Sequence, residues 1–228
     1  MRLRVLLYNV HGFRAGIGRV AAVVARYEPD VVFLNETGGR WRLRRFARSL
    51  GMQAAADPLS PLHRRVKDAV LVRPPWRLRA HRLERLEPSE WFLPRGALVA
   101  EVRRDGHACT AIATHLGLRP AERIRHAREL VGLVERAELP VIVGGDLNER
   151  PDGRAFSMLA DRLWDAWFLG GDAAGETFPA AGATARIDAL FVSEGVRVER
   201  ALVPAYEEVR SASDHLPVVA ELTLPEPG

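Results

Sequence analysis

The sequence predicts an α/β (α+β) fold in which two packed β-sheets lie between outer helices. Three observations support this prediction. Apolar segments of strand length outnumber segments with helical spacing, hairpins are mixed with crossover connections, and the polar motif residues come at strand ends rather than within strands. Two sheets that bury one face against each other and the other face under helices satisfy this pattern.

The N-terminal part alternates strands and helices. Leu3–Asn9 is predicted to be the first strand, and apolar residues at helical spacing predict a helix over residues 18–27 that ends before Pro29. Val31–Asn35 is predicted to be the second strand. The helix after it should end at Gly51 and bury a stripe formed by Trp41, Leu43, Phe46 and Leu50.

The rest of the chain is predicted to add strands and one long helix. Proline and charge dominate residues 57–75, where only Ala69–Val72 should be a strand. Ala97–Val102 and Cys109–Thr114 flank Arg104-Asp105-Gly106, whose Asp-Gly pair is typical of a hairpin turn. Pro120 suits the first turn of a helix that runs to about Arg136. Its buried face is predicted to carry Ile124, Ala127, Val131 and Val134. The last strands are predicted at Pro140–Gly144, Ile187–Val192, Val196–Val203 and Pro217–Leu224.

The composition limits the class of protein. A chain of 228 residues that is 47% hydrophobic is expected to form one domain over residues 1–228. We expect no membrane segment or signal peptide, since no apolar stretch approaches roughly 20 residues. The lone Cys109, in a strand-like setting, fits a core position in a reducing, cytoplasmic environment. The net charge of +4 permits phosphate-rich partners, although an arginine bias with a single lysine, Lys67, also results from a GC-rich genome.

Short polar clusters end or follow the predicted strands. They are Asn9, Glu36, His115, Asp146 with Asn148, Asp188, and Asp214 with His215. The strands would deliver these side chains to one common edge. A carboxylate at a buried strand end is costly unless it is paired or binds a metal, so convergence on a metal or on one another is favoured.

Each of these residues, taken singly, also has a structural explanation. Asn9 and Asn148 suit turns, Glu36 suits a helix cap, His115 suits a hydrogen-bonded core position, and Asp188 suits an ion pair within the fold. Independent capping would not place an acid, an amide or an imidazole after nearly every central strand. Together the clusters therefore predict an active site.

Three motifs, in this order, carry a family resemblance: Gly145-Asp146-Leu147-Asn148, RIDALFV at 186–192, and SDHLP at 213–217. From Asn9 to His215 the chain resembles the endonuclease/exonuclease/phosphatase (deoxyribonuclease I-like) superfamily. That superfamily includes deoxyribonucleases, abasic-site endonucleases, neutral sphingomyelinases and inositol polyphosphate 5-phosphatases. The resemblance implies a four-layer α/β/β/α sandwich with two mixed sheets and the active site at one edge.

The resemblance also implies a Mg²⁺ or Mn²⁺ cofactor. In the family the residue that matches Glu36 is the principal metal ligand, helped by those that match Asn9 and Asp214. Oxygen ligands suit a hard, octahedral cation. A small number of protein ligands leaves positions for water and a phosphate oxygen. The sequence does not decide between one metal and two.

Catalytic roles follow from the same resemblance. Asp188 should orient His215, as the acid does in other hydrolytic triads. Asp146 should orient or deprotonate the attacking water, while Asn148 and His115 donate hydrogen bonds to the non-bridging oxygens. Water is expected to attack phosphorus in line, without a covalent enzyme intermediate. Both Asp146 and His215 stay candidates for the general base.

Some residues depart from the family pattern. At His115, abasic-site endonucleases usually carry tyrosine, so specificity for abasic sites is disfavoured. Asn35 stands where glutamine is more frequent, a change that should leave Glu36 intact as a ligand. The linkers are short, notably between Asn148 and Asp188, which leaves little chain for loops that grip a duplex or insert into a membrane.

Substrate contacts are predicted from arginine and aromatic residues. Arg95 precedes a strand that runs toward the site and is the preferred phosphate contact, the alternative being an exposed loop arginine. The second helix carries basic residues that either follow a phosphate backbone or, more simply, form a solvated face: Arg42, Arg44, Arg45 and Arg48. Other residues could stack on bases, although core packing is the simpler explanation: Trp91, Phe92, Trp164, Trp167 and Phe178.

The leading hypothesis is a Mg²⁺-dependent phosphodiesterase that acts on DNA, RNA or a nucleotide-like diester. The alternative is a phosphomonoesterase or a lipid or inositol phosphate hydrolase of the same fold. The scarcity of lysine disfavours an inositol phosphatase, and the sequence shows no exposed apolar loop for a lipid substrate. A catalytically silent binding module is disfavoured because the costly carboxylates are intact. The natural substrate, the choice of endo or exo cleavage, obligate protein partners and the oligomeric state are not predicted.

Overall fold

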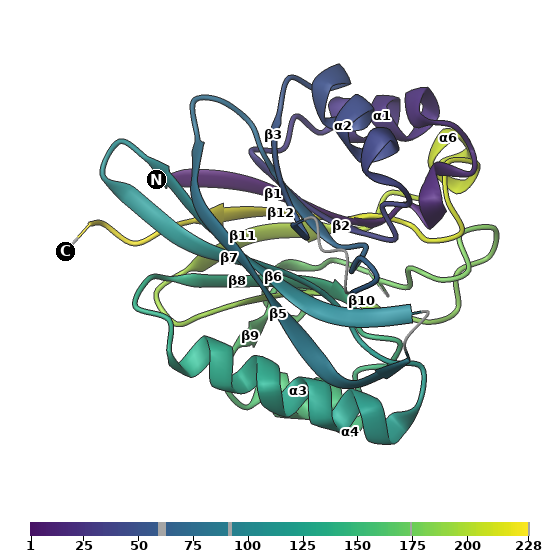
Figure 1. Ribbon diagram of the computed structural model, residues 1–228. Coiled ribbons are helices and arrows are strands. Elements are labelled where there is room, and N and C mark those ends of the chain that lie inside the picture. Colours follow the sequence, from purple (N-terminus) through teal and green to yellow (C-terminus); the bar gives the residue numbers. More distant parts are fainter. Residues whose placement is uncertain (59–62, 91–92, 174, 228) are drawn as a thin grey trace.

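The computed structural model describes residues 1–58, 63–90, 93–173 and 175–227 and contains two six-stranded sheets packed face to face (Figure 1). The first sheet has the order β11 (Arg197–Leu202), β12 (Val218–Thr223), β1 (Arg2–Asn9), β2 (Val31–Asn35), β4 (Ala69–Val72) and β3 (Gln53–Ala56). The second has the order β5 (Arg77–Glu90), β6 (Leu93–Arg104), β7 (His107–His115), β8 (Val141–Asp146), β10 (Asp188–Val192) and β9 (Trp164–Asp165). Both sheets combine parallel and antiparallel pairs.

Helices cover the outer face of each sheet, which confirms the four-layer sandwich. The first sheet is covered by α1 (Ile17–Arg26), α2 (Arg40–Ser49) and α6 (Glu207–Arg210), and the second by α3 (Pro120–Glu135) and α4 (Arg154–Ala160). A 3₁₀ turn, η1 (His11–Phe13), follows β1, and the short α5 (Ala166–Gly170) packs on β11. Among the described residues, no helix is both long and apolar enough to cross a membrane.

The central strands are buried on both faces, which explains their continuous apolar runs. In β1, Leu3, Val5 and Leu7 pack between the sheets, whereas Leu6 and Tyr8 pack under the helices. This alternation follows from the two-residue period of a strand. Polar side chains are therefore excluded from the middle of these strands and collect at their ends.

Strand pairing brings those ends to one edge of the sandwich. Asn9 of β1 pairs with Asn35 of the parallel strand β2, and His115 of β7 pairs with Asp146 of the parallel strand β8. Because β10 runs antiparallel to β8, its first residue, Asp188, also pairs with Asp146. The antiparallel strand β12 starts beside the end of β1, and the two chain termini lie at the opposite end of the strands (Figure 1).

The two sheets approach each other closely just below this edge. A Cβ atom on Gly144 of β8 would lie 2.7 Å from the ring of Phe33 in the facing sheet. A Cβ atom on Gly145 would lie 2.3 Å from the carbonyl oxygen of Thr114 in β7. The glycine pair before Asp146 is therefore required by packing, because a side chain at Gly144 would push the layers apart and one at Gly145 would collide with the neighbouring strand β7.

Two predicted helix faces need correction. Trp41 does not belong to the buried stripe of α2: it is 61% exposed, and the guanidinium of Arg45 lies 5.4 Å from its ring centroid. In α3 the buried stripe consists of Ala127, Leu130 and Leu133, together with His126. Of the predicted face only Ala127 is fully buried, because α3 also packs against α4 and is turned toward it. Cys109 is buried, as predicted.

Several elements were not predicted. The largest is β5, an edge strand whose sequence RLRAHRLERLEPSE is rich in charge because only one of its long edges pairs with another strand. The strands β3 and β9 and the helices α4, α5 and α6 are short, with few periodic apolar positions. The remaining predicted strands and both long N-terminal helices are present within a few residues of their predicted bounds.

Candidate active site

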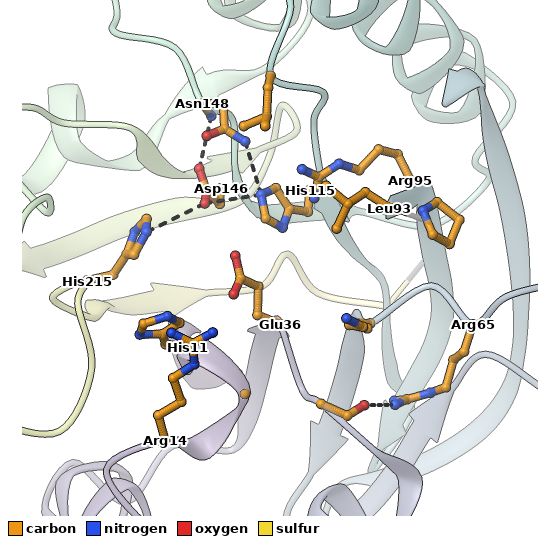
Figure 2. A pocket seen from close by; sticks show the side chains of 15 residues that line it. His11, Arg14, Glu36, Arg65, Leu93, Arg95, His115, Asp146, Asn148 and His215 are labelled. Atoms are coloured by element: carbon orange, nitrogen blue, oxygen red, sulfur yellow. Dashed lines mark hydrogen bonds and ion pairs between the residues drawn. The ribbon is translucent and has the colours of Figure 1, made fainter. Parts of the chain in front are cut away.

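The converging strand ends surround a cavity of about 300 Å³ (Figure 2). Its floor is formed by predicted site residues, namely Glu36, His115, Asp146, Asn148 and His215. Arg95, the predicted phosphate contact, lies in its wall. Asn9, Asp188 and Asp214 are not in the lining but contact or neighbour these residues. The structure thus brings the predicted site residues together.

His215 is held between two carboxylates. Its Nδ1 lies 2.8 Å from Oδ2 of Asp188, and its Nε2 lies 3.8 Å from Oδ2 of Asp146 on the cavity side. The ring of Phe178 packs against the imidazole, with the centroids 4.8 Å apart. Burial lowers the pKa of His215, but Asp188, Asp146 and Asp214 outweigh this and raise it to about 9. The imidazole is therefore protonated at neutral pH.

Asp146 is buried and held on both oxygens. Its Oδ1 accepts a hydrogen bond from the backbone N–H of Asn148 at 2.9 Å, and its Oδ2 accepts one from the amide of Asn9 at 3.0 Å. Burial, together with the charge of Asp188, raises the pKa of Asp146 to about 7, although His215 opposes the shift. A carboxylate of this kind accepts a proton more readily than an exposed aspartate.

Asn148 and His115 form a pair beside Asp146. Asn148 has a left-handed backbone with φ 50°, and its side-chain amide donates to the carbonyl of Leu116 at 3.0 Å. The same amide lies 3.0 Å from Nε2 of His115. Burial and the charge of Arg95 hold the pKa of His115 well below its usual value, so the ring is neutral. The same Nε2 lies 3.3 Å from Oδ2 of Asp146, so His115, Asn148 and Asp146 form one contact network.

Glu36 offers an unpaired carboxylate to the cavity. Its φ of 54° turns the chain sharply after β2, and its carbonyl accepts from the N–H of Gly12 at 2.8 Å. Figure 2 shows the carboxylate directed toward His115, Asp146 and His215. It accepts a hydrogen bond from the Asn9 amide at 3.3 Å, and within the described ranges no arginine, lysine or histidine nitrogen lies within 4.0 Å of it. Such a carboxylate fits a bound cation as its counter-charge.

Asn9 lies beside Glu36, and Asp214 lies beside His11 of the cavity lining. Oδ2 of Asp214 lies 3.3 Å from Nδ1 of His11, and the Asn9 oxygen accepts from the His11 backbone N–H at 3.1 Å. The Asn9 amide faces the carboxylates, so only the second lone pair of its oxygen is free for a metal. Ligand atoms of Asp146, Asp188 and His215 also lie within 4.8 Å of one another, but these three groups are already paired through His215.

A polar bridge that was not predicted joins the two sheets below the site. The Asn35 amide donates to Asp68 at 2.8 Å and to the Thr114 carbonyl at 2.8 Å, while its oxygen accepts from the Asp146 backbone N–H at 2.9 Å. Burial raises the pKa of Asp68 to about 7. The bridge fixes the backbone that carries Asp146 relative to the strand that precedes Glu36.

Replacing Asn35 by leucine should therefore lower both stability and turnover. The substitution keeps the volume but leaves the buried Asp146 N–H and Asp68 without their partner, so the free energy of unfolding should fall by about 1–3 kcal/mol. Urea unfolding followed by fluorescence measures this loss. Asn35→Gln, which keeps the amide, is the matched comparison. Unchanged stability in Asn35→Leu would contradict the bridge.

Other predicted contacts are placed differently. Arg42, Arg44, Arg45 and Arg48 do not line the cavity; Arg42 donates to the Gly12 carbonyl at 2.6 Å and Arg48 to the Arg44 carbonyl at 3.3 Å, as expected for a solvated face. Trp164 is exposed and Trp167 packs at the edge of the core, both away from the cavity lining. Trp91 and Phe92 lie outside the described residues.

Part of the cavity lining was not predicted. It includes the basic residues His11, Arg14, Arg65 and Lys67 and the apolar residues Leu93, Pro94 and Leu118. Leu118 is 61% exposed and Leu93 37% exposed. The short spacing of His11 after Asn9 is the one sequence signal that pointed to any of them. Leu93 and Pro94 begin β6 ahead of its predicted start, and the remaining residues come from loops whose course the sequence pattern does not define.

Two mixed six-stranded sheets between helices, with acids, amides and imidazoles at one edge, define a phosphoesterase-type fold. The chain belongs to the Endonuclease/Exonuclease/phosphatase family, whose sequence profile matches residues 6–215. Members of this family are hydrolases that act on phosphate esters and generally depend on a divalent metal. The resemblance seen in the sequence motifs is therefore confirmed.

Solved structures support the fold assignment. An endonuclease/exonuclease/phosphatase family protein from Bacteroides thetaiotaomicron has a TM-score of 0.86 and 21% identity, covering 99% of each chain. A mannosyl-6-phosphatase from the same organism has a TM-score of 0.82 and 21% identity, covering 97% of this chain and 100% of that one. TDP2 from D. rerio, complexed with a single-strand DNA product, has a TM-score of 0.79 and 17% identity over 97% and 99% of the two chains. No curated protein sequence matches the chain significantly.

Proposed function

We propose that the protein is a Mg²⁺- or Mn²⁺-dependent phosphodiesterase of the nuclease type, which hydrolyses a nucleic acid strand or a nucleotide-like diester by direct attack of water. The observation that carries the proposal is the buried Asp188–His215 pair, whose Nε2 faces Asp146 beside the cavity that Glu36 enters. This arrangement places a cationic donor, a buried acceptor and an unpaired acid around one substrate-sized space.

Glu36, with Asp214 and the Asn9 oxygen, would hold the cation, because these are hard oxygen donors and Glu36 lacks a counter-charge. When bound, the cation stabilises the negative charge of the phosphate and of the leaving oxygen. His11, beside Asp214, would help to orient that carboxylate. Because Asp188 and His215 pair with each other, we assign them to contact with the phosphate and not to the metal.

In the proposed reaction, one protein group accepts the proton of the attacking water and others donate hydrogen bonds to the phosphate. The hydrogen bond to Asp188 fixes the His215 ring, and the surrounding carboxylates keep it charged, so its Nε2 donates to a phosphate oxygen. Asp146, held by Asn148 and Asn9, is then the group that accepts the proton of the attacking water. His115, which lies beside Asn148 in the cavity lining, is a further donor to the phosphate oxygens.

The size of the site supports a single strand or a short diester rather than a duplex. The cavity of about 300 Å³ suits a small group of atoms around the scissile phosphate. A phosphomonoesterase is the second candidate, since the fold is shared with a mannosyl-6-phosphatase and the lining contains several cations. A phosphodiesterase should hydrolyse bis-p-nitrophenyl phosphate faster, whereas a phosphomonoesterase should hydrolyse p-nitrophenyl phosphate faster.

The proposal is tested by a hydrolysis screen with single-stranded DNA, RNA, bis-p-nitrophenyl phosphate and p-nitrophenyl phosphate in the presence of Mg²⁺. Diester hydrolysis that EDTA abolishes and added Mg²⁺ restores is expected, with His215→Ala as the inactive control. A wild-type protein that cleaves none of the diesters, or one that cleaves them equally well in EDTA, would remove the proposed function.

Metal binding is expected to depend on Glu36 directly. Glu36→Gln removes the charge but keeps the shape, so Mn²⁺ affinity, measured by titration calorimetry or by the electron paramagnetic resonance signal of free Mn²⁺, should fall more than about 10-fold. Asp152→Asn, an exposed acid outside the cavity lining, is the matched control and should bind Mn²⁺ like the wild type. Equal affinities for both variants would exclude Glu36 as a ligand.

A further inference from the structure

One side of the cavity carries more positive charge than a single phosphodiester requires. Arg65, Lys67 and Arg95 all line it, and Figure 2 shows Arg65 and Arg95 on the side away from His215. Lys67 is the one lysine of the chain, and it lies in this lining. A diester has one negative charge, which His215 and the proposed cation already meet, so these three residues are available for another anion.

The nearby carboxylates of Asp57 and Asp68 attract Arg65, and Asp68 also attracts Arg95, but within the described residues neither carboxylate forms an ion pair with these cations. Asp57 and Asp68 are both 2% exposed. Asp57 is already engaged by Arg85 at 3.5 Å and by the N–H of Val66 at 2.7 Å, and Asp68 accepts from Asn35 instead. Neither Lys67 nor Arg95 has an ion pair or a side-chain hydrogen bond within residues 1–58, 63–90, 93–173 and 175–227.

Two hydrogen bonds hold the side chain of Arg65 in place. Its guanidinium donates to the carbonyl of Gly38 and, at 2.8 Å, to the hydroxyl of Thr37, the residue after Glu36. Its Nε is buried and has no partner in the described part of the chain. Burial and the neighbouring Arg40 lower the pKa of Arg65 by more than Asp57 and Asp68 raise it, so its charge is held in an unfavourable setting. A bound anion would offset that cost.

The apolar part of the lining adjoins the same cations. Leu93 and Pro94 directly precede Arg95, and Leu118 is exposed on the loop after β7. Apolar side chains beside cations suit a base or sugar that lies between two phosphates.

We propose that Arg65, Lys67 and Arg95 form a second anion subsite, which binds a phosphate adjacent to the scissile one. The inference rests on the proposed function and narrows it: the preferred substrate is a diester that carries an additional phosphate one nucleotide unit away. A guanidinium and an ammonium group together bind such a phosphate by charge-assisted hydrogen bonds.

Binding is tested without turnover, using thymidine 3′,5′-bisphosphate and thymidine 5′-monophosphate as probes in titration calorimetry with EDTA present. The wild type should bind the bisphosphate about tenfold more tightly or better, the gain expected from one charge-assisted hydrogen bond. Lys67→Met and Arg65→Met should lose this preference while keeping their affinity for the monophosphate. Arg200→Met, an exposed arginine on β11, is the control and should keep the preference.

Hydrolysis separates this inference from the proposed function. The dinucleotide pTpT should have a lower KM than TpT with the wild type, and Lys67→Met should raise the KM for pTpT toward that for TpT without changing kcat. Equal binding of the two probes to the wild type, or equal losses in Lys67→Met and Arg200→Met, would overturn the subsite. If the bisphosphate preference is present but neither dinucleotide is cleaved, the subsite stands and the proposed diesterase activity fails.

Discussion

Asp146→Asn is expected to lower kcat by a factor of about 10²–10⁴, the range for loss of a general base, while the protein still folds. Asparagine keeps the size of the side chain and its oxygen still accepts from Asn148, but it cannot take a proton from water. Loss of the buried charge should cost little, because the pKa of the wild-type carboxyl is raised to about 7, whereas the new NH₂ group faces the Asn9 amide donor and should lower the free energy of unfolding by about 1–3 kcal/mol. Steady-state kinetics on bis-p-nitrophenyl phosphate and thermal unfolding by circular dichroism give both quantities.

A buried aspartate elsewhere controls for the loss of a buried charge. Asp57 is equally buried at 2% exposure, pairs with Arg85 and does not line the cavity. Asp57→Asn should therefore lower the unfolding temperature and leave kcat nearly unchanged. Full activity in Asp146→Asn would remove Asp146 from the proposed mechanism and leave His215 as the candidate base.

His215→Ala should have an effect of similar size, a loss of about 10²–10⁴ in kcat, because it removes the proposed hydrogen-bond donor to the phosphate. Asp188→Asn should lower kcat by a large part of that factor, since Asp188 contacts the site through His215. The double variant should be no slower than His215→Ala, because two residues that act as one unit are not additive. Multiplied losses in the double variant would show that Asp188 acts independently of His215.

The central strands were predictable because their residues are apolar on both faces. Leu3–Asn9 and Val31–Asn35 were identified for that reason, and their parallel pairing sets Asn9 beside Asn35. Once the strands are placed in one sandwich, Asp146 and Asp188 must meet, since they are register partners. The convergence of the polar strand ends could therefore be predicted from the local sequence pattern and the order of the strands along the chain.

The parts that were missed depend on long-range contacts. The charge-rich β5 is a strand because it pairs with β6, and nothing in its own sequence shows a buried face. The Asn35–Asp68 contact joins residues far apart in the chain, and it forms only after β2 and β4 have paired. Arg65 and Lys67 reach the cavity because the segment before β4 lies against Thr37, which donates to the Lys67 carbonyl at 3.0 Å. The local pattern of apolar and polar residues around Lys67 does not predict this contact with Thr37.

The glycine pair of β8 should affect how the reaction rate depends on temperature, pressure and substitutions in the core. Glu36 belongs to one sheet and Asp146 to the other, and the gap between those layers is set where Gly144 meets Phe33. Swelling or compression of the sandwich would thus change the separation of Glu36, the proposed metal ligand, and Asp146, the proposed base. Temperature, hydrostatic pressure or a larger residue deep in the interior should then alter reaction rate well before the protein melts.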